Sequence, residues 1–185
     1  MLFRSRAAQS ALYHIMHCMM RLMAPILSFT ANEIWQTLGL DADKTVFEDV
    51  WYELPKHRLG EKEILAWEDV INVRGFVNKA IEEKRAQSLV GSSLQSEIDI
   101  HTDGKLYESL ASLKDDLRFV MISSRANVYK KADSGMQIEV TPSTHAKCDR
   151  CWHYRADVGS HAEHSTICGR CVSNLFGTGE ERKYA

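Results

Sequence analysis

The sequence lacks any run of about 18 or more uncharged apolar residues, the length that a helix needs to cross a bilayer, so we predict no membrane span. It also lacks a strong net charge, because 23 Lys and Arg oppose 25 Asp and Glu and leave −2 at pH 7. A polyanionic partner would therefore have to meet local basic patches rather than a basic chain. Internal repeats and low-complexity tracts are missing too, which argues against repeat arrays.

Acidic residues are missing from the first thirty positions, where the charged side chains are Arg4, Arg6 and Arg21. An amphipathic, Arg-containing start without acids also occurs in organelle transit peptides. We favour a folded helix, since the pattern continues directly into a second helix signal. Because the helix is already under way at residue 5, we expect the chain to be part of a longer protein, and the mass of the native protein would decide this.

Apolar spacing predicts three helices in the first half of the chain. The first covers about 5–23 and ends near Pro25. The second begins at a capping box of Thr30 and Glu33 and stops at Gly39. An extended connection over 41–60 leads to a long helix over about 61–86. The apolar residues that mark these helices are Ala8, Leu12, Ile15, Met19, Leu22 and Met23, then Ile34, Trp35 and Leu38, then Ile64, Trp67, Ile71, Val77 and Ile81.

The hydrophobic period changes after residue 91. Alternation at Ile98 and Ile100 predicts a strand, and 104–113 is typical of a short helix. Further strands are predicted over 118–124, 127–130 and 137–141, with a hairpin turn at 133–135 before the last. The fold class is therefore α+β: a mainly helical bundle (1–90), a small α+β unit (91–142) and a four-cysteine zinc finger (143–185).

Four of the five cysteines form two Cys-x-x-Cys pairs, and the fifth, Cys18, stands alone in the first predicted helix. An odd count without a secretory signal favours a reducing cytoplasm and metal binding rather than disulfides. The segment is also too polar to fold by hydrophobic burial alone, and a metal could supply about 10–16 kcal/mol of apparent folding free energy.

The cysteine spacing predicts one structural zinc ion. Two thiolates three residues apart reach the same tetrahedral ion, and two such pairs close its shell, whereas a catalytic zinc keeps an open position. Competing ligands are His145, His153, His161 and His164, and a redox role of the Cys-x-x-Cys pairs is a further alternative. The ligands that we predict are Cys148, Cys151, Cys168 and Cys171.

Cations alternate with aromatic residues around the cysteines, as in surfaces that bind phosphates and stack unpaired bases. These candidates for RNA contact are Arg150, Trp152, Arg170, Arg182 and Lys183. Nearby acids oppose their charge, as do the four thiolates on a divalent ion. A finger that serves only structure or protein docking therefore stays open as the alternative.

Residues 148–185, "CDRCWHYRADVGSHAEHSTICGRCVSNLFGTGEERKYA", resemble the C-terminal zinc finger of bacterial isoleucyl-tRNA synthetases, a finger type shared with formamidopyrimidine-DNA glycosylases. The segments "RLMAPILSFTANEIW", "WEDVINVRGFVNKAIEEKR" and "VGSSLQSEIDI" resemble the anticodon-binding helical bundle of these class I enzymes. Ser28 departs from the family's proline. The resemblance covers the whole chain in order, and the combination of bundle and finger distinguishes it from the glycosylases.

The resemblance implies the tRNA-binding C-terminal part of an enzyme that joins isoleucine to its tRNA with ATP. The implied partners are isoleucine tRNA and the rest of the synthetase chain, and we expect a monomer. HIGH-type, KMSKS-type and P-loop sequences are missing from these residues, so ATP and isoleucine would bind only in a separate catalytic domain and no catalytic residue is expected here. Further candidates for phosphate contact are Arg4, Arg6, Arg74, Lys79, Lys84 and Arg85. A DNA-binding finger of a repair enzyme is a second alternative, although "MLFRS" supplies neither a catalytic proline nor a glutamate.

Overall fold

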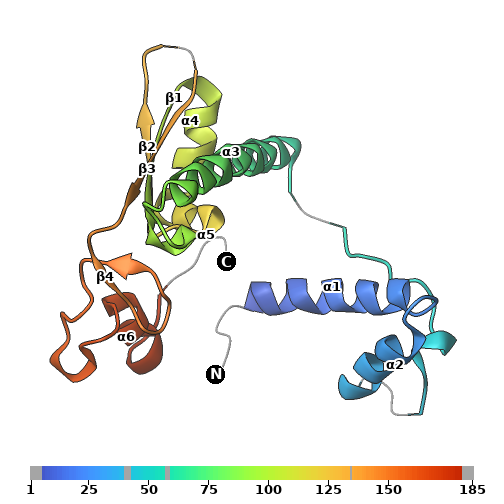
Figure 1. The fold of residues 1–185 in the computed structure, drawn as a ribbon. Helices are drawn as coiled ribbons and strands as arrows, with labels where there is room; N and C mark the ends of the chain where they lie inside the picture. Colours follow the sequence, from blue (N-terminus) through green and yellow to red (C-terminus); the bar gives the residue numbers. More distant parts are fainter. Residues whose placement is uncertain (1–5, 40–42, 57–58, 134, 181–185) are drawn as a thin grey trace. The chain divides into compact units, whose positions relative to one another are not determined.

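The computed structural model of the chain describes residues 6–39, 43–56, 59–133 and 135–180. Its contacts divide the chain into two compact units at residues 58 and 59 (Figure 1). Each unit has its own buried core. Within the described ranges, no helix is long and apolar enough to cross a membrane.

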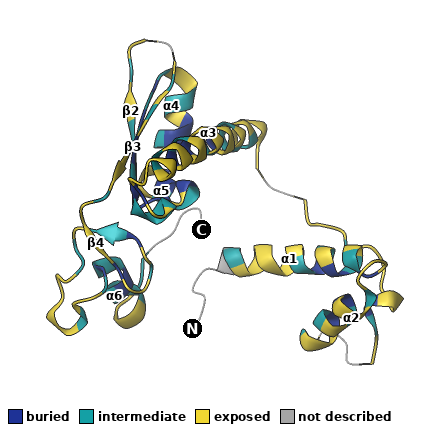
Figure 2. Cartoon of the chain, in the orientation of Figure 1, coloured by how far each residue is buried: buried dark blue, intermediate teal, exposed yellow. Residues whose placement is uncertain are grey.

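The first unit consists of α1 (Arg6–Met23), α2 (Ser28–Thr37) and the 3-10 turn η1 (Val46–Glu48). Its core is small, and the exposed surface of both helices is extensive (Figure 2). Trp35 of α2 is buried and donates a hydrogen bond from Nε1 to the Lys44 carbonyl at 3.1 Å, which ties the connection back onto the helix. The buried core residues are Met20, Ala24, Ala31, Trp35 and Val46.

Arg21 of α1 fixes the segment that follows η1. Its guanidinium pairs with Asp49 and donates from Nε to the Val50 carbonyl at 2.9 Å. The same group lies over the rings of Trp35 and Tyr52, 5.2 Å from each centroid. Arg21 is therefore a structural cation whose charge is already engaged.

The apolar stripe that predicted α1 only partly enters the core. Leu12, Ile15, Met19 and Leu22 are each at least half exposed, whereas Met23 packs on the core. The periodicity of apolar residues identifies a helix, but it does not show which of these residues are buried in the core.

The start of α2 differs from the prediction, because the helix begins at Ser28 and Thr30 lies inside its first turn. Ser28 is the first helical residue, a position that favours proline in general, and its hydroxyl donates to the Ala24 carbonyl at 2.9 Å. The helix end is as predicted: Gly39 has φ +61° and its N–H bonds the Gln36 carbonyl. The capping box at Thr30 and Glu33 is thus wrong.

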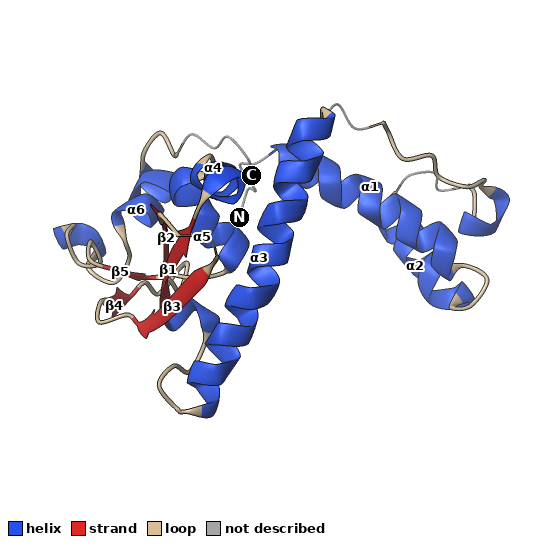
Figure 3. Cartoon of the chain, turned by 90° about the horizontal axis from the view of Figure 1, so that it is seen from above, coloured by secondary structure: helices blue, strands red, loops and turns tan. Residues whose placement is uncertain are grey.

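A three-stranded sheet in the order β2-β1-β3 forms the centre of the second unit (Figure 3). The central strand β1 (Ser96–Thr102) pairs in parallel with β2 (Arg125–Lys130) and antiparallel with β3 (Gln137–Pro142). Ile98 and Ile100 point into the core, while Glu97 and Asp99 lie on the opposite face, as the alternation predicted. The predicted hairpin over 127–141 is wrong, since β1 lies between the two strands.

Helices α3 (Glu61–Ala86), α4 (Gly104–Ala111) and α5 (Leu117–Met121) cover one face of this sheet (Figure 1). The 3-10 turn η2 (Ser93–Gln95) connects α3 to β1, and η3 (Lys114–Asp116) connects α4 to α5. Helix α3 buries Val70, Val73, Val77 and Ile81, whereas Ile71 of the predicted stripe is mostly exposed. Because α3 packs on the sheet, it belongs to the second compact unit and not to residues 1–58. The predicted domain boundaries at residues 90 and 142 stay a prediction.

The predicted strand over 118–124 is wrong, because its first part is the helix α5. Leu117 and Met121, four residues apart, are both fully buried on one helix face. The helix ends at Ile122, which adopts the left-handed conformation at φ 54°. A short apolar run fits a strand and a helix equally well by pattern, so packing decides.

Candidate metal centre and nucleic-acid interface

The C-terminal finger has few elements of its own: a two-stranded ribbon of β4 (Ala146–Lys147) and β5 (Tyr154–Arg155), the turn η4 (Ala162–His164) and the helix α6 (Gly169–Phe176). The first Cys-x-x-Cys pair occupies the turn between β4 and β5. In the second pair, Cys168 caps α6 and Cys171 lies in its first turn. Asp157 supports this helix start by accepting a hydrogen bond from the Gly169 N–H at 2.9 Å.

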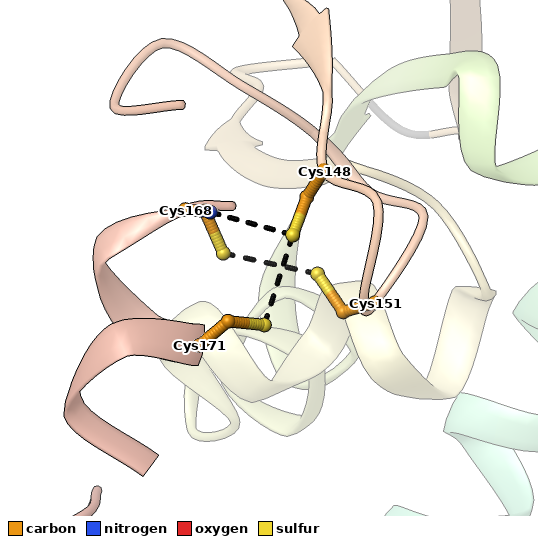
Figure 4. A group of neighbouring side chains, drawn as sticks. All are labelled: Cys148, Cys151, Cys168 and Cys171. Carbon is orange, nitrogen blue, oxygen red and sulfur yellow. Dashed lines mark hydrogen bonds between the residues drawn. The ribbon is translucent and has the colours of Figure 1, made fainter. Parts of the chain in front are cut away.

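The four predicted thiols point toward a common centre (Figure 4). All four sulfur atoms lie within 4.8 Å of one another. The Cys148–Cys171 and Cys151–Cys168 sulfur pairs are 3.7 Å and 3.8 Å apart. Four sulfurs at roughly 2.3 Å from one ion at tetrahedral corners lie about 3.8 Å apart. The donor set and its spacing therefore fit a four-thiolate zinc centre.

Backbone N–H groups around the centre favour the thiolate form of Cys148. The Cys168 N–H donates to the Cys148 sulfur at 3.3 Å. Burial alone would raise the pKa of Cys148, but hydrogen bonds from the N–H groups of Cys151, Cys168 and Arg150 lower this pKa to about 6. Burial raises the pKa of Cys151 and that of Cys168, the latter to about 11. Without a cation Cys151 and Cys168 hold their protons, so a divalent ion is needed to balance thiolates at these two positions.

The four histidines considered as ligands lie outside this group, which among the described residues contains cysteines alone. The Nε2 of His145 lies 3.8 Å from a Glu97 carboxylate oxygen. The His164 ring stacks on the Phe176 ring, with 3.9 Å between the two ring centroids. His161 is exposed. His153 is buried and its Nδ1 bonds the Cys151 carbonyl at 3.1 Å. Burial, aided by nearby arginines, lowers the pKa of His153, so the ring is neutral at pH 7.

The finger is anchored on the sheet unit by polar and aromatic contacts. The Ser124 hydroxyl, just before β2, accepts a hydrogen bond from the Tyr154 N–H at 2.6 Å and donates to the Leu94 carbonyl. Phe119 of α5 meets the edge of His153 at 5.6 Å between ring centroids. These contacts join segments about thirty residues apart, which is why local sequence patterns give no signal for them.

Arg170 belongs to this junction. Its guanidinium binds both carboxylate oxygens of Glu180, at 2.6 and 2.8 Å, and lies 4.7 Å from the centroid of Phe119. The pairing outweighs burial and raises the pKa of Arg170. The predicted base contact at Arg170 thus also holds the end of the described chain against α5.

The turn of the first cysteine pair presents Trp152 to solvent. Its side chain is 60% exposed, although its backbone has the left-handed φ of 65° and its N–H bonds the Cys148 carbonyl at 2.9 Å. Lys147 lies 5.5 Å from the centroid of the indole ring. Arg150 is exposed beside it and donates to the Cys171 sulfur at 3.6 Å. We call Lys147, Arg150 and Trp152 the knuckle surface.

The other predicted RNA contacts lie on α3, on the start of α1 or outside the residues that the structure describes. Arg74 is half-buried in the middle of the helix, and Lys84 and Arg85 occupy its last turn. Arg85 pairs with Glu82 at 2.7 Å. The structure does not bring these cations together with the knuckle turn in one cluster. Arg4, Arg182 and Lys183 lie outside the described residues, and Arg6 is described only as the start of α1.

Two family models match the chain. The anticodon-binding domain of tRNA ligase matches residues 2–100, and the zinc finger found in FPG and IleRS matches residues 147–174. The first match covers both units in part, since it includes α1, α2 and α3 and extends to β1. The second covers the four cysteines and the knuckle turn.

Similar curated proteins include the isoleucine–tRNA ligases of Janthinobacterium sp. (strain Marseille) and Cupriavidus necator, each 49% identical over 184 residues, and that of Burkholderia cenocepacia (strain HI2424), 48% identical over 181. Each alignment covers 97% of this chain but only 19% of the relative's length. The chain therefore belongs to the anticodon-binding domain family of tRNA ligases and, with its zinc finger, resembles bacterial isoleucine–tRNA ligases over nearly its whole length.

Proposed function

We propose that this chain is the tRNA-binding part of an isoleucyl-tRNA synthetase and that it recognises the anticodon stem-loop of isoleucine tRNA. Activation of isoleucine with ATP would take place in the rest of the synthetase, to which this chain would deliver the correct tRNA. The family matches and the relatives carry the assignment to a tRNA ligase, and they favour RNA over the DNA of a repair enzyme.

The observation that carries RNA contact is the knuckle surface. An indole ring held largely in solvent by a strained backbone costs stability, and such strain persists where a site uses it. A base of a single-stranded loop could stack on the Trp152 ring while Lys147 and Arg150 approach the adjacent phosphates. Anticodon loops present such unpaired bases, whereas the deep groove of an RNA helix does not.

Zinc has a structural part in this proposal. Cys148, Cys151, Cys168 and Cys171 would hold the ion, which fixes the turn that presents Trp152. Arg150 would partly neutralise the negative charge of the four-thiolate centre through its contact with Cys171. No step of the reaction is assigned to the metal, because the four cysteine sulfurs would fill all four ligand positions of a bound zinc ion.

The docking alternative has support from a separate observation. Ser124, Phe119 and Arg170 fasten the finger to the sheet unit, so the finger acts as a scaffold in either case. The two roles are compatible, since one side of the finger meets α5 and the knuckle turn stays exposed. The alternative that excludes RNA contact is the one to be tested.

The test is binding of the chain to isoleucine tRNA and to valine tRNA across a salt series, with zinc and with a chelator. Phosphate contacts predict a steep loss of affinity as salt rises. A zinc-dependent preference for isoleucine tRNA would support recognition by the finger. Equal affinity for both tRNAs, or no binding by the zinc-loaded chain, would contradict the proposal and leave the finger as a scaffold.

A further inference from the structure

A polar cavity lies in the second unit, and none of its lining residues belongs to the finger. It has a volume of about 290 Å³, at the small end of the roughly 300–1,000 Å³ typical of ligand pockets. It is open to solvent and suits a small group of a larger molecule rather than a whole cofactor. Its lining residues come from α3, η2 and the end of α5: Arg74, Asn78, Ile81, Glu82, Ser93 and Ile122.

Arg74 gives the cavity its charge. Within the described part of the chain its guanidinium forms no ion pair, and its Nε is buried without a hydrogen-bond partner. The side chain of Arg74 lines the cavity, and without a paired carboxylate its charge is available to an anion that enters. A planar guanidinium with several N–H donors matches the oxygens of a phosphate.

The other polar groups make the cavity suitable for an anion. Asn78 lies one helical turn after Arg74 and contributes an amide, and Ser93 contributes a hydroxyl from η2. Glu82 is the acidic residue of the lining, but Arg85 binds its Oε1 at 2.7 Å. The charge of Glu82 is therefore balanced, and the charge of Arg74 is left for a ligand.

Ile122 forms part of the wall in a conformation that its side chain disfavours. A β-branched residue at φ 54° is a genuine outlier, and outliers of this kind cluster at ligand clamps. The next two residues hold it there: the Ser123 N–H bonds the Arg118 carbonyl at 3.0 Å, and the Ser124 N–H bonds the Ser96 carbonyl at 2.9 Å. The wall is thus fixed before any ligand arrives.

We propose that this cavity binds one backbone phosphate of the RNA, with Arg74 as its charge partner and Asn78 and Ser93 as neutral donors. The inference rests on the proposed function and deepens it, because it names a chemical group of the RNA and the residues that hold it. Asn78 and Ser93 lie in segments that resemble the anticodon-binding bundle, but the sequence does not single them out as phosphate contacts, and Ile122 lies outside those segments; the cavity brings the three together.

The test uses the full zinc-loaded chain and the anticodon stem-loop RNA of isoleucine tRNA. Arg74→Gln should weaken binding about tenfold and reduce the slope of log affinity against log salt by about one. Ser93→Ala should weaken binding about threefold. The matched control is Lys62→Gln, an exposed cation in the first turn of the same helix that does not line the cavity, and it should leave both quantities unchanged.

Neutral methylphosphonate groups, placed at one RNA position at a time, identify the phosphate. One position should weaken binding to the unaltered chain as much as Arg74→Gln does and have no further effect on that variant. If no position couples to Arg74, or if Arg74→Gln and Ser93→Ala bind like the unaltered chain, the cavity is not a phosphate site. Failure of the unaltered chain to bind RNA would instead overturn the proposed function, and this inference with it.

Discussion

Two features of Trp152 lower the stability of the fold: its backbone has a left-handed φ, and its apolar ring is exposed to solvent. A side chain in this region is strained relative to glycine by roughly 1 kcal/mol. Replacement by Ala keeps the strain and removes the ring, whereas replacement by Gly removes both. The two variants therefore separate what the residue does for RNA from what it does for folding.

We expect Trp152→Ala and Trp152→Gly to weaken stem-loop RNA binding equally, by about 1–3 kcal/mol, because both lose the same stacking surface. We expect the Gly variant to unfold at a higher temperature than the Ala variant, because it relieves the strain. Titration with labelled RNA and thermal unfolding measure the two effects. Full-strength binding by either variant would show that the indole ring does not contact RNA.

The Cys148 sulfur accepts hydrogen bonds from several backbone N–H groups of the centre, and we expect Cys148→Ser to abolish zinc binding and unfold 145–180. The physical reason is that the metal supplies about 10–16 kcal/mol to a segment whose buried cluster consists of the cysteines themselves, with, among the described residues, only Val158 and Ile167 packed against them. Zinc release assays and amide spectra measure this, and signals of 6–39 should not change. Cys18→Ser is the control, because Cys18 lies outside the sulfur cluster. Unchanged amide signals for 145–180 in the Cys148→Ser variant would contradict the expectation.

At the scale of elements, the exposed face of the sheet is held by an ionic clamp. Arg125 of β2 binds Glu97 at 2.8 Å and Asp99 at 3.1 Å on β1, and the Ser143 hydroxyl donates to Glu97 at 2.7 Å. Burial alone would raise the pKa of Glu97, but hydrogen bonds from Ser143 and Arg125 lower it below its usual value of 4.5. The carboxylate therefore binds protons more weakly in the folded state than in the unfolded state.

The sign of the pH effect follows from this difference. The clamp stabilises the fold fully above pH 4.5, and the stabilisation is lost as the pH falls through the lowered pKa of Glu97. We expect Glu97→Gln to lower the free energy of unfolding by about 2 kcal/mol at pH 7 and by much less at pH 3. Urea unfolding of the unaltered chain and of the variant at each pH measures the two free energies of unfolding. Both proteins release zinc in acid, so this effect cancels in the difference between the two free energies. A deficit independent of pH would exclude the ionic origin.

Sequence patterns predicted the elements that local spacing determines. Helix α3 has the predicted bounds, and β1 shows the predicted alternation around Ile98 and Ile100, because one face of each element meets the same core. The pairing of β2 with β1 was not predicted, since it joins residues about 28 apart and no turn signal marks it. Helix α5 was missed because five residues are too few to show a helical period.

The candidate site shows the same distinction. The spacing of the four cysteines predicted their convergence, because two tight turns leave few other ways to share one ion. The anchoring of the finger by Ser124 and Phe119 was not predictable, since a serine before a strand and a phenylalanine in a helix are common and neither indicates a contact about thirty residues away. The cavity around Arg74 likewise depends on Ile122, whose left-handed backbone is unusual for its residue type.

At the scale of the whole molecule, the two units differ in how much core they bury. Among the described residues, the apolar cluster of the second unit has twelve buried members, drawn from α3, α4, α5, the sheet and the connection after α4, and that of the first unit has five. A unit of fewer than about 60 residues with so little burial is marginal by itself. The second unit contains the zinc centre as an additional source of stability.

We therefore expect residues 59–185 to fold alone when zinc is present and residues 1–58 to stay largely unfolded alone. The measurement compares the amide spectrum of each fragment with that of the full chain. Residues 91–185 serve as the control, because removing α3 takes away Val70, Val73, Val77 and Ile81 from the core and should prevent folding of the sheet. If 91–185 folds as well as 59–185, α3 is not a structural part of the second unit, and a boundary near residue 90 describes the chain better.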